Sequence, residues 1–336
     1  MSNSKTFTPT PPPFDLKPEF EELMPDTAQP QPDVITAEQL ILMNVTEIPC
    51  LVSPILQSVG LACLAGSSDT GKSIFLRQLA MAICAERNFL GFEISPKHRS
   101  VLYISTEDYQ QATAFFLNRQ AARYRPEQLR NLRFIFGTDD ILLKLEQEAV
   151  RQPLDLVIID CFADLYGCDL RDTQKIRSFL QPYLDFSEKH KCLVLFLHHT
   201  GKRTEYLEPS KNNLLSGQGF EGKMRLVLEL RTDTTQPDIK HLCIVKGNYL
   251  PSTMKTESIV LSFDASSFTY TDTGKRVVLS DLAKPTDSET QTRLKYEQAK
   301  ELKEEGKSYE TIAERMGYKS KSAISDLLKK GEKNGW

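Results

Sequence analysis

Apolar and polar positions fall into two kinds of block along this chain. Short apolar runs predict buried strands, and longer segments with apolar residues three or four apart predict helices. Helical patterns occupy residues 37–43, 74–83, 110–123, 141–151 and 172–189. The strand candidates are residues 61–65, 101–105, 133–136, 154–160, 192–197, 226–230, 241–245 and 259–263.

Alternation of strands with helices at this spacing predicts an α/β domain whose mostly parallel sheet lies between helices. The last three strand candidates, beginning at 226, follow one another with no helix between them. We therefore expect these three to be antiparallel additions at one edge of the sheet.

The same patterning divides the chain into four regions. Residues 1–32 are rich in Pro, Thr and Glu, with Pro11, Pro12 and Pro13 in a row, and predict a disordered tail. The strand–helix alternation fills 33–271, a polar stretch with Pro285 at 272–290 predicts a linker, and 291–336 has a wholly helical pattern.

Residues 66–73 read GSSDTGKS, the Gly-x-x-x-x-Gly-Lys-Ser pattern of a phosphate-binding loop, between a strand candidate and a helix candidate. Backbone N–H groups of such a loop cradle phosphates, the lysine reaches the terminal phosphates and the serine hydroxyl ligates Mg²⁺. We therefore predict that ATP and Mg²⁺ are the cofactors. The expected cradle is Gly66, Ser67, Ser68, Asp69, Thr70, Gly71, Lys72 and Ser73.

Acidic residues follow two strand candidates. Asp160 ends LDLVIID and is predicted to hold Mg²⁺, directly or through water. Many ATPases have a catalytic Glu next, but this chain has Cys161, so the best candidate for the general base is Glu107 in YISTED. Asp108 is the second candidate for this role, and it could instead cap the following helix.

Two histidines, His198 and His199, end the strand candidate in LFLHHTGK. At the carboxyl edge of a parallel sheet one of them could hydrogen-bond the γ-phosphate, and His199 is favoured. A zinc site is not expected there, because no third ligand sits at metal spacing in the sequence.

Length and composition limit which kinds of partner, cysteine chemistry and cellular location this protein can have. The 336 residues carry a net charge of −3, so any contact with nucleic acid must be local. The seven cysteines mostly sit in apolar runs without a Cys-x-x-Cys pair, which indicates reduced core cysteines rather than disulfides or zinc. No apolar stretch is long enough to span a membrane, so we expect a cytoplasmic protein.

The C-terminal region has the pattern of a helix-turn-helix. Gly306 ends a first helix, Ser308 and Ser320 can cap two shorter ones, and Gly317 makes the turn between those. Phosphates and base edges of DNA would then meet the start of the third helix, at Lys319, Ser320, Lys321 and Ser322. The alternative is a small helical clip that packs on a neighbour or partner protein.

Together GSSDTGKS, YISTED, LDLVIID and LFLHHTGK resemble the motifs of RecA-like ATPases, in the same order and spacing. Over about residues 45–265 the chain is most similar to RepA-type hexameric helicases of plasmids and mobile elements. DnaB and KaiC are more distant relatives. The resemblance implies a RecA-like core, a six-membered ring and ATP bound between two subunits.

The resemblance also implies roles for single residues. Lys72 and Ser73 match the phosphate-loop pair, and Arg225 matches an arginine that reaches a neighbouring subunit's γ-phosphate. Lys246 resembles a similar late finger of DnaB-like proteins. The remaining matches are the catalytic glutamate Glu107, the magnesium aspartate Asp160 and the sensor histidine His199.

The chain departs from the family pattern at Asn248, where some relatives have a second basic residue, and at SGQG (216–219). Surface charges at strand ends are the alternative for Arg225 and Lys246. The polar segment 200–218 resembles the mobile loop that lines the channel of RecA-like rings. Lys202, Arg203 and Lys211 would there track single-stranded DNA, and an ordinary solvated loop is the alternative.

Three functions fit these features. The first is a ring-forming DNA helicase or helicase loader, a homo-oligomer expected to be a hexamer, in replication or mobilisation of a plasmid or mobile element. The second is an ATP-switched DNA-binding regulator without unwinding activity. The third is a signalling or phosphotransfer ATPase of the KaiC kind, against which the helix-turn-helix pattern argues.

Overall fold

The computed structural model describes residues 34–201, 204–283 and 288–336, so the tail expected at 1–32 lies outside the described residues. The chain divides into two units, residues 1–47 and 48–336. In the first unit α1 (Ala37–Leu42) begins at a capping box, in which the Thr36 hydroxyl and the Gln39 side chain accept each other's backbone N–H. Its apolar side chains, Leu40, Ile41 and Leu42, are exposed.

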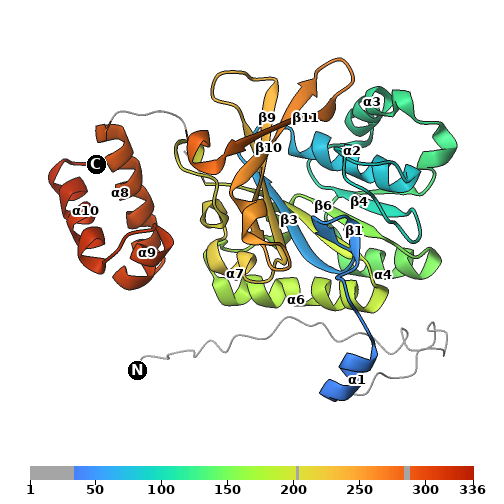
Figure 1. The fold of residues 1–336 in the computed structure, drawn as a ribbon, viewed down its shortest axis with the longest axis horizontal. Helices are drawn as coiled ribbons and strands as arrows, with labels where there is room; N and C mark the ends of the chain where they lie inside the picture. Colours follow the sequence, from blue (N-terminus) through green and yellow to red (C-terminus); the bar gives the residue numbers. More distant parts are fainter. Residues whose placement is uncertain (1–33, 202–203, 284–287) are drawn as a thin grey trace, which may run out of the picture. The chain divides into compact units, whose positions relative to one another are not determined.

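A nine-stranded sheet forms the centre of the second unit (Figure 1). Its strands lie in the order β11-β10-β9-β8-β3-β7-β6-β4-β5. A separate hairpin pairs β1 (Cys50–Val52) with β2 (Leu56–Gln57). The strands of the sheet are β3 (Gly60–Gly66), β4 (Val101–Ser105), β5 (Leu132–Phe136), β6 (Leu156–Asp160), β7 (Leu193–His199), β8 (Leu226–Thr232), β9 (Ile239–Gly247), β10 (Glu257–Asp264) and β11 (Thr269–Val278).

Six neighbouring strands, from β8 to β5, are parallel, which confirms the mostly parallel α/β sheet expected from the sequence. The expectation that β8 is antiparallel was wrong, because β8 pairs in parallel with β3. The short helix α7 (Gly217–Glu221) lies in the glycine-rich segment before β8, where the sequence pattern showed no helix. The antiparallel additions are β9, β10 and β11.

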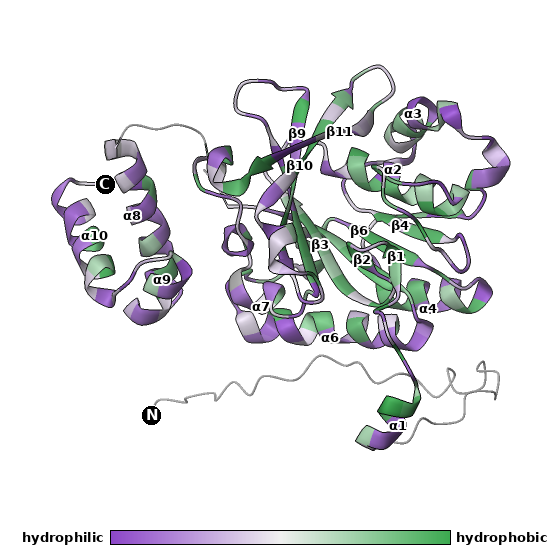
Figure 2. Cartoon of the chain, in the orientation of Figure 1, coloured by the Kyte–Doolittle hydropathy of each residue, from purple (hydrophilic) through white to green (hydrophobic). Residues whose placement is uncertain are grey.

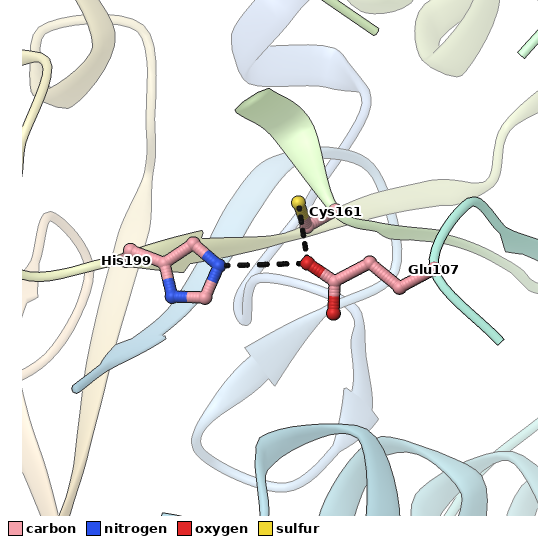
Figure 3. Close-up of side chains that lie close together, drawn as sticks. All are labelled: Glu107, Cys161 and His199. Atoms are coloured by element: carbon pink, nitrogen blue, oxygen red, sulfur yellow. Dashed lines mark hydrogen bonds and ion pairs between the residues drawn. The ribbon is translucent and has the colours of Figure 1, made fainter. Parts of the chain in front are cut away.

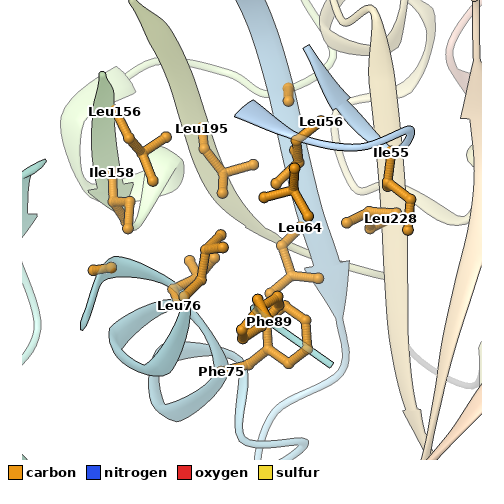
Figure 4. Close-up of a cluster of buried hydrophobic side chains, with 14 of the residues drawn as sticks. Ile55, Leu56, Leu64, Phe75, Leu76, Phe89, Leu156, Ile158, Leu195 and Leu228 are labelled. Carbon is orange, nitrogen blue, oxygen red and sulfur yellow. The ribbon is translucent and has the colours of Figure 1, made fainter. Parts of the chain in front are cut away.

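Helices cover both faces of the sheet (Figure 1). On one face α2 (Lys72–Ala85) contributes Phe75, Leu76 and Leu79 to a core shared with the β1–β2 hairpin (Figure 4). The other core contains residues of α4 (Ile141–Arg151), α5 (Phe162–Tyr166) and α6 (Thr173–His190). Figure 2 shows green strands at the centre of the sheet, and green and purple segments alternating along helices such as α4 and α6.

Alternate residues of β3 supply both cores, Leu64 to the first and Leu61 and Cys63 to the second. Every residue of this strand is buried. A parallel strand covered on both faces is apolar without alternation, which is why the sequence shows a continuous apolar run. The phosphate-binding loop therefore begins at the end of a fully buried strand.

The last strand, β11, was missed by the sequence pattern. It runs to Val278 and is followed by a 3₁₀ turn at Leu279–Leu282, so residues 272–282 are not the linker that their polarity indicated. Most residues of β11 are exposed at the edge of the sheet, and only Tyr270 is buried. Because an exposed edge strand has no apolar repeat, its polar composition resembles that of a linker.

Three C-terminal helices enclose a small core of their own: α8 (Ser288–Glu304), α9 (Tyr309–Arg315) and α10 (Lys321–Lys333). Gly306 and Gly317 take positive φ angles of 78° and 70° in the two turns, as their positions in the sequence predict. The Ser308 hydroxyl caps α9 by accepting from Thr311 N, whereas Ser320 makes no such bond at α10.

None of the helices that the structure describes combines the length and the apolar character needed to cross a membrane.

Candidate nucleotide-binding and catalytic site

The phosphate-binding loop connects the end of β3 to the first residue of α2. Gly71 has a φ of +84°, which favours glycine, and a Cβ there would overlap the hydroxyl of Tyr270. A Cβ on Gly66 would lie 2.5 Å from the carbonyl oxygen of Leu230. Both glycines are therefore required by close approaches as well as by the motif.

Lys72 begins α2, and its ammonium lies inside the loop. The side chain is buried, and Nζ donates to the carbonyl oxygen of Ser67 at 2.7 Å. Burial lowers the pKa of Lys72, and the charges of Asp160 and Glu107 oppose that effect. Ser67, Ser68 and Asp69 are exposed on the loop, and Thr70 is buried under it.

Asp160 ends β6 beside the loop and is 4% exposed. Tyr103 on β4 donates to its Oδ2 at 2.5 Å, while Oδ1 is buried and has no hydrogen-bond partner among the described residues. Burial raises the pKa of Asp160, and the neighbouring hydroxyls of Tyr103 and Ser73 oppose this. A buried carboxylate oxygen without a partner, next to a serine hydroxyl, is a donor set that fits Mg²⁺.

Glu107 follows β4 at the same edge of the sheet. Thr106 fixes its backbone there, since Thr106 N donates to the Asp160 carbonyl oxygen at 2.8 Å and Thr106 Oγ1 accepts from Cys161 N at 2.8 Å. The Glu107 side chain is 53% exposed, so water can reach it. This position suits a residue that takes a proton from water.

Asp108 does not cap the helix that follows it, as the sequence suggested it could. Its Oδ2 lies 3.1 Å from Nη1 of Arg77, a guanidinium that is 2% exposed, and the residue at the N-cap of α3 (Gln110–Gln120) is Tyr109. Arg77 also lies over the ring of Phe116. Sequence reasoning missed Arg77, although a charged residue on the apolar face of α2 is a signal of a buried ion pair.

The two histidines occupy different environments. His198 is fully buried against Phe162 and Phe220, and its Nε2 lies 2.5 Å from Ser216 Oγ. Burial lowers the pKa of His198 to about 3, so this ring is neutral at physiological pH. His199 points toward the site, with Nε2 3.8 Å from Glu107 Oε1 (Figure 3). Burial, then the charge of Lys72, lowers the pKa of His199.

Lys72 lies at the carboxyl ends of the parallel strands, whereas Arg225 and Lys246 lie near the amino end of β8. Arg225 precedes the first residue of β8, and Lys246 pairs with Val227 near that end of the strand. Arg225 is exposed, whereas Lys246 Nζ contacts Glu221 Oε1 at 2.8 Å. The start of β8 is level with Ala62 of β3, and the phosphate loop begins four residues later, at Gly66. At about 3.3 Å per residue, neither side chain can reach the phosphate loop of its own chain.

The segment after His199 is held at several points. Lys202 and Arg203 lie outside the described residues, and Lys211 pairs with Glu221 at 3.2 Å. The buried Glu229 accepts from Ser210 N at 3.0 Å and lies 2.6 Å from Arg231 Nε. The loop expected to be mobile therefore has a buried ion pair at its base.

The residues proposed to contact duplex DNA are all at the surface. Lys319, Ser320, Lys321 and Ser322 are exposed before and in the first turn of α10. Lys321 pairs with Glu310 of α9 at 2.9 Å, and the hydroxyls of Ser320 and Ser322 lie 2.8 Å apart. Both side chains of the Lys321–Glu310 pair are mostly exposed, so this pair is easily exchanged for other partners.

Tyr270 is a second contact that the sequence does not reveal. From β11 its hydroxyl donates to the carbonyl oxygen of Gly71 at 3.2 Å, and its backbone pairs with both polar atoms of the Gln78 side chain. The edge of the antiparallel addition thus supports the phosphate loop and α2. No motif marks this residue, because it depends on pairing between distant strands.

Comparisons with known proteins bear on the fold and on the family. No curated protein matches the chain. Among solved structures, one described as an ATPase domain is similar with a TM-score of 0.54 and 13% sequence identity, over 70% of this chain and 95% of that domain. The shared feature is the fold, a RecA-like P-loop core. A family model described as AAA domain matches residues 27–205, which include Lys72, Glu107 and Asp160. Since the match spans more than half of the chain, this protein belongs to the AAA domain family.

Proposed function

We propose that this protein is an ATP-hydrolysing, ring-forming DNA helicase or helicase loader of the RepA type, acting in replication or mobilisation of a plasmid or mobile element. One observation carries the proposal. Lys72, Asp160 and Glu107 meet at the carboxyl edge of the parallel sheet, whereas Arg225 stands at the other edge. A nucleotide site of this kind is completed by a second copy of the chain.

The proposed reaction is attack of water on the γ-phosphate of ATP. Glu107 accepts the proton of the attacking water, and Lys72 balances the charge that develops on the phosphoryl oxygens. Ser73 and Asp160 would hold Mg²⁺, which neutralises charge on the phosphates when bound. His199 lies next to Glu107 and would report the γ-phosphate to the segment that follows it.

The position of Arg225 supports the proposal that the protein oligomerises. An exposed arginine at the far sheet edge can act only on the nucleotide of a neighbouring subunit, where it would stabilise charge in the transition state. We propose a ring of six copies. Lys246 is the weaker candidate for a second finger, because it must first leave Glu221.

DNA would meet the ring in two places. Lys202, Arg203 and Lys211 would contact a single strand in the channel, and Lys319 to Ser322 would contact duplex through a helix-turn-helix. The cytoplasm is the proposed location. ATP-dependent movement of 200–218 would have to loosen the attachment to Glu229.

A second candidate function is an ATP-switched DNA-binding regulator without unwinding activity. Its specific support is that Lys211 and Lys246 are both engaged by Glu221, while the basic start of α10 is open to solvent. A regulator of this type would use its C-terminal helices and leave the channel loop closed.

Subunit mixing tests the shared site. Lys72→Ala and Arg225→Ala should each abolish ATPase activity when assembled alone. When the two variants are mixed in equal amounts, part of the ATPase activity should return. The intact phosphate loop of an Arg225→Ala subunit can then face the intact Arg225 of a Lys72→Ala subunit. Arg276→Ala is the matched control, since that arginine is exposed and pairs with Asp272 within β11. No recovery on mixing, with particle mass unchanged by ATP, would refute the shared site.

DNA dependence separates the two candidates. A helicase should hydrolyse ATP several-fold faster with single-stranded DNA, whereas a regulator should respond mainly to duplex. Lys319→Ala with Lys321→Ala should reduce the salt slope of duplex binding by about 2, because each lysine that neutralises a phosphate contributes about one. The control substitutions Lys329→Ala and Lys330→Ala lie on the same helix and should change the salt slope of duplex binding less. Equal duplex affinity in both pairs would favour the helical-clip alternative.

A further inference from the structure

Three side chains of different chemistry converge next to the phosphate loop (Figure 3). Cys161 Sγ lies 3.5 Å from Glu107 Oε1, and His199 Nε2 lies 3.8 Å from the same oxygen. All three donor atoms lie within 4.8 Å of one another. The residues end or follow β4, β6 and β7, which are neighbours in the sheet.

Two of the three distances between these atoms are close to those of a tetrahedral zinc site. Bond lengths of about 2.3 Å to sulfur and about 2.0 Å to nitrogen or oxygen place tetrahedral ligands about 3.3–3.5 Å apart. The Glu107–Cys161 distance of 3.5 Å already matches, and the Glu107–His199 distance of 3.8 Å needs only a small side-chain rotation. Sequence spacing did not predict a zinc role for the histidines, because the two further ligands come from other strands and meet His199 only in the fold.

We propose that Glu107, Cys161 and His199 form a binding site for a borderline-soft divalent cation of the Zn²⁺ class, with water in the fourth position. Thiolate, imidazole and carboxylate together favour Zn²⁺ over Mg²⁺, which prefers oxygen ligands. Binding converts the Cys161 thiol to a thiolate and releases one proton to solvent. The two negative ligands then balance the charge of the cation.

The surroundings of Glu107, Cys161 and His199 let a cation enter from solvent, and they leave the magnesium ligands Ser73 and Asp160 free. Glu107 is half-exposed and provides the path from solvent, while Cys161 is buried at the base. Asp164, hydrogen-bonded to Thr106 Oγ1 at 2.5 Å, adds negative charge near His199, and the nearby positive charge of Lys72 opposes the cation. Ser73 and Asp160 remain available for the ion that accompanies ATP.

The consequence for turnover rests on the proposed function of Glu107. A carboxylate bound to Zn²⁺ cannot take the proton of the attacking water. The cation would therefore act as a reversible inhibitor of hydrolysis that leaves the phosphate loop intact. Binding of the cation itself depends on geometry alone and stands apart from the ATPase proposal.

Cobalt titration of the untagged full chain, without nucleotide, tests the binding site. Co²⁺ should bind at one site per chain and give a thiolate-to-cobalt absorption band, which Zn²⁺ then removes. Cys161→Ser should lose the band, Glu107→Gln and His199→Asn should each weaken binding by more than about tenfold, and the exposed Cys168→Ser should behave as wild type. Glu107→Gln at a half-exposed position keeps the test valid if Cys161→Ser fails to fold.

The absence of a thiolate band, or unchanged binding in Glu107→Gln and His199→Asn, would overturn the site. Inhibition is measured separately, with Zn²⁺ added at saturating Mg²⁺ and ATP. Relative to its own rate without Zn²⁺, each of wild type and Cys168→Ser should lose turnover, and Cys161→Ser should lose a much smaller fraction of its own rate. Cobalt binding without inhibition would preserve the site and reject Glu107 as the base, so the two proposals fail independently.

Discussion

The hydroxyl of Tyr270 donates to the carbonyl oxygen of Gly71 at 3.2 Å, which joins the edge strand β11 to the phosphate-binding loop. The same hydroxyl fills the space that a Cβ on Gly71 would need. The glycine of the motif and the tyrosine, 199 positions later, therefore constrain each other. This relationship makes the loop sensitive to a strand that carries no recognised motif.

Replacing Tyr270 with Phe should remove this hydrogen bond, destabilise the protein by about 1 kcal/mol and weaken ATP binding several-fold. Gly71→Ala should be more harmful, because of the overlap and the positive φ. In a double-mutant cycle the pair should cost less than the sum of the singles, since Phe leaves room for the methyl group. Chemical denaturation and nucleotide titration measure both effects, and strict additivity would contradict the contact.

Asp160→Asn should stabilise the nucleotide-free protein at neutral pH by about 1–2 kcal/mol while preventing stabilisation by Mg²⁺ and ATP. Burial raises the pKa of Asp160 in the folded state, so its ionisation at neutral pH costs folding free energy. That cost is absent below the unfolded-state pKa of about 3.9 and grows as the pH rises through the folded-state pKa. The advantage of the variant should therefore shrink towards pH 4 in thermal unfolding experiments.

Neighbouring acids at 107 and 108 should behave differently. Glu107→Gln should retain ATP binding and stability but lose turnover, because Glu107 is half-exposed at the reacting edge. Asp108→Asn should retain turnover but lose roughly 2 kcal/mol of stability, since it leaves the buried Arg77 guanidinium without its partner charge. Parallel measurement of kcat and of unfolding free energy distinguishes the two, and loss of turnover in Asp108→Asn with intact stability would reverse the assignment.

His198 should make the fold sensitive to acid. Burial lowers the pKa of His198 from 6.5 to about 3, so the unfolded chain binds a proton that the folded chain does not. This contribution to stability is complete above pH 6.5 and is lost at about 1.4 kcal/mol per pH unit as the pH falls from there. His198→Gln should be less stable at pH 7 but should show a flatter dependence.

The exposed His98→Gln is the control for this experiment and should follow the wild-type profile. Urea unfolding at a series of pH values gives the slopes directly. Equal slopes in wild type and His198→Gln between pH 6 and pH 4 would show that His198 is not buried as a neutral ring.

Local sequence determined much of this protein. Helix α4 and strand β4 have the bounds that their apolar patterns predict, and the motif at 66–73 connects a buried strand to a helix as expected. These features depend on residues near one another in the chain, where backbone preference and side-chain period act together. The glycines at 66 and 71 were also predicted by the local motif, but the atoms that leave no room for a side chain there, from Leu230 and Tyr270, are known only from the tertiary structure.

Other features were decided by pairing between distant segments. The direction of β8, the extent of β11, the Arg77–Asp108 pair and the support of Gly71 by Tyr270 depend on which strands become neighbours. The meeting of Glu107, Cys161 and His199 has the same origin, because parallel strands bring their carboxyl ends to one edge whatever their separation in sequence. The sequence thus contained each reactive group, but only the order of strands in the sheet decided which groups share a site.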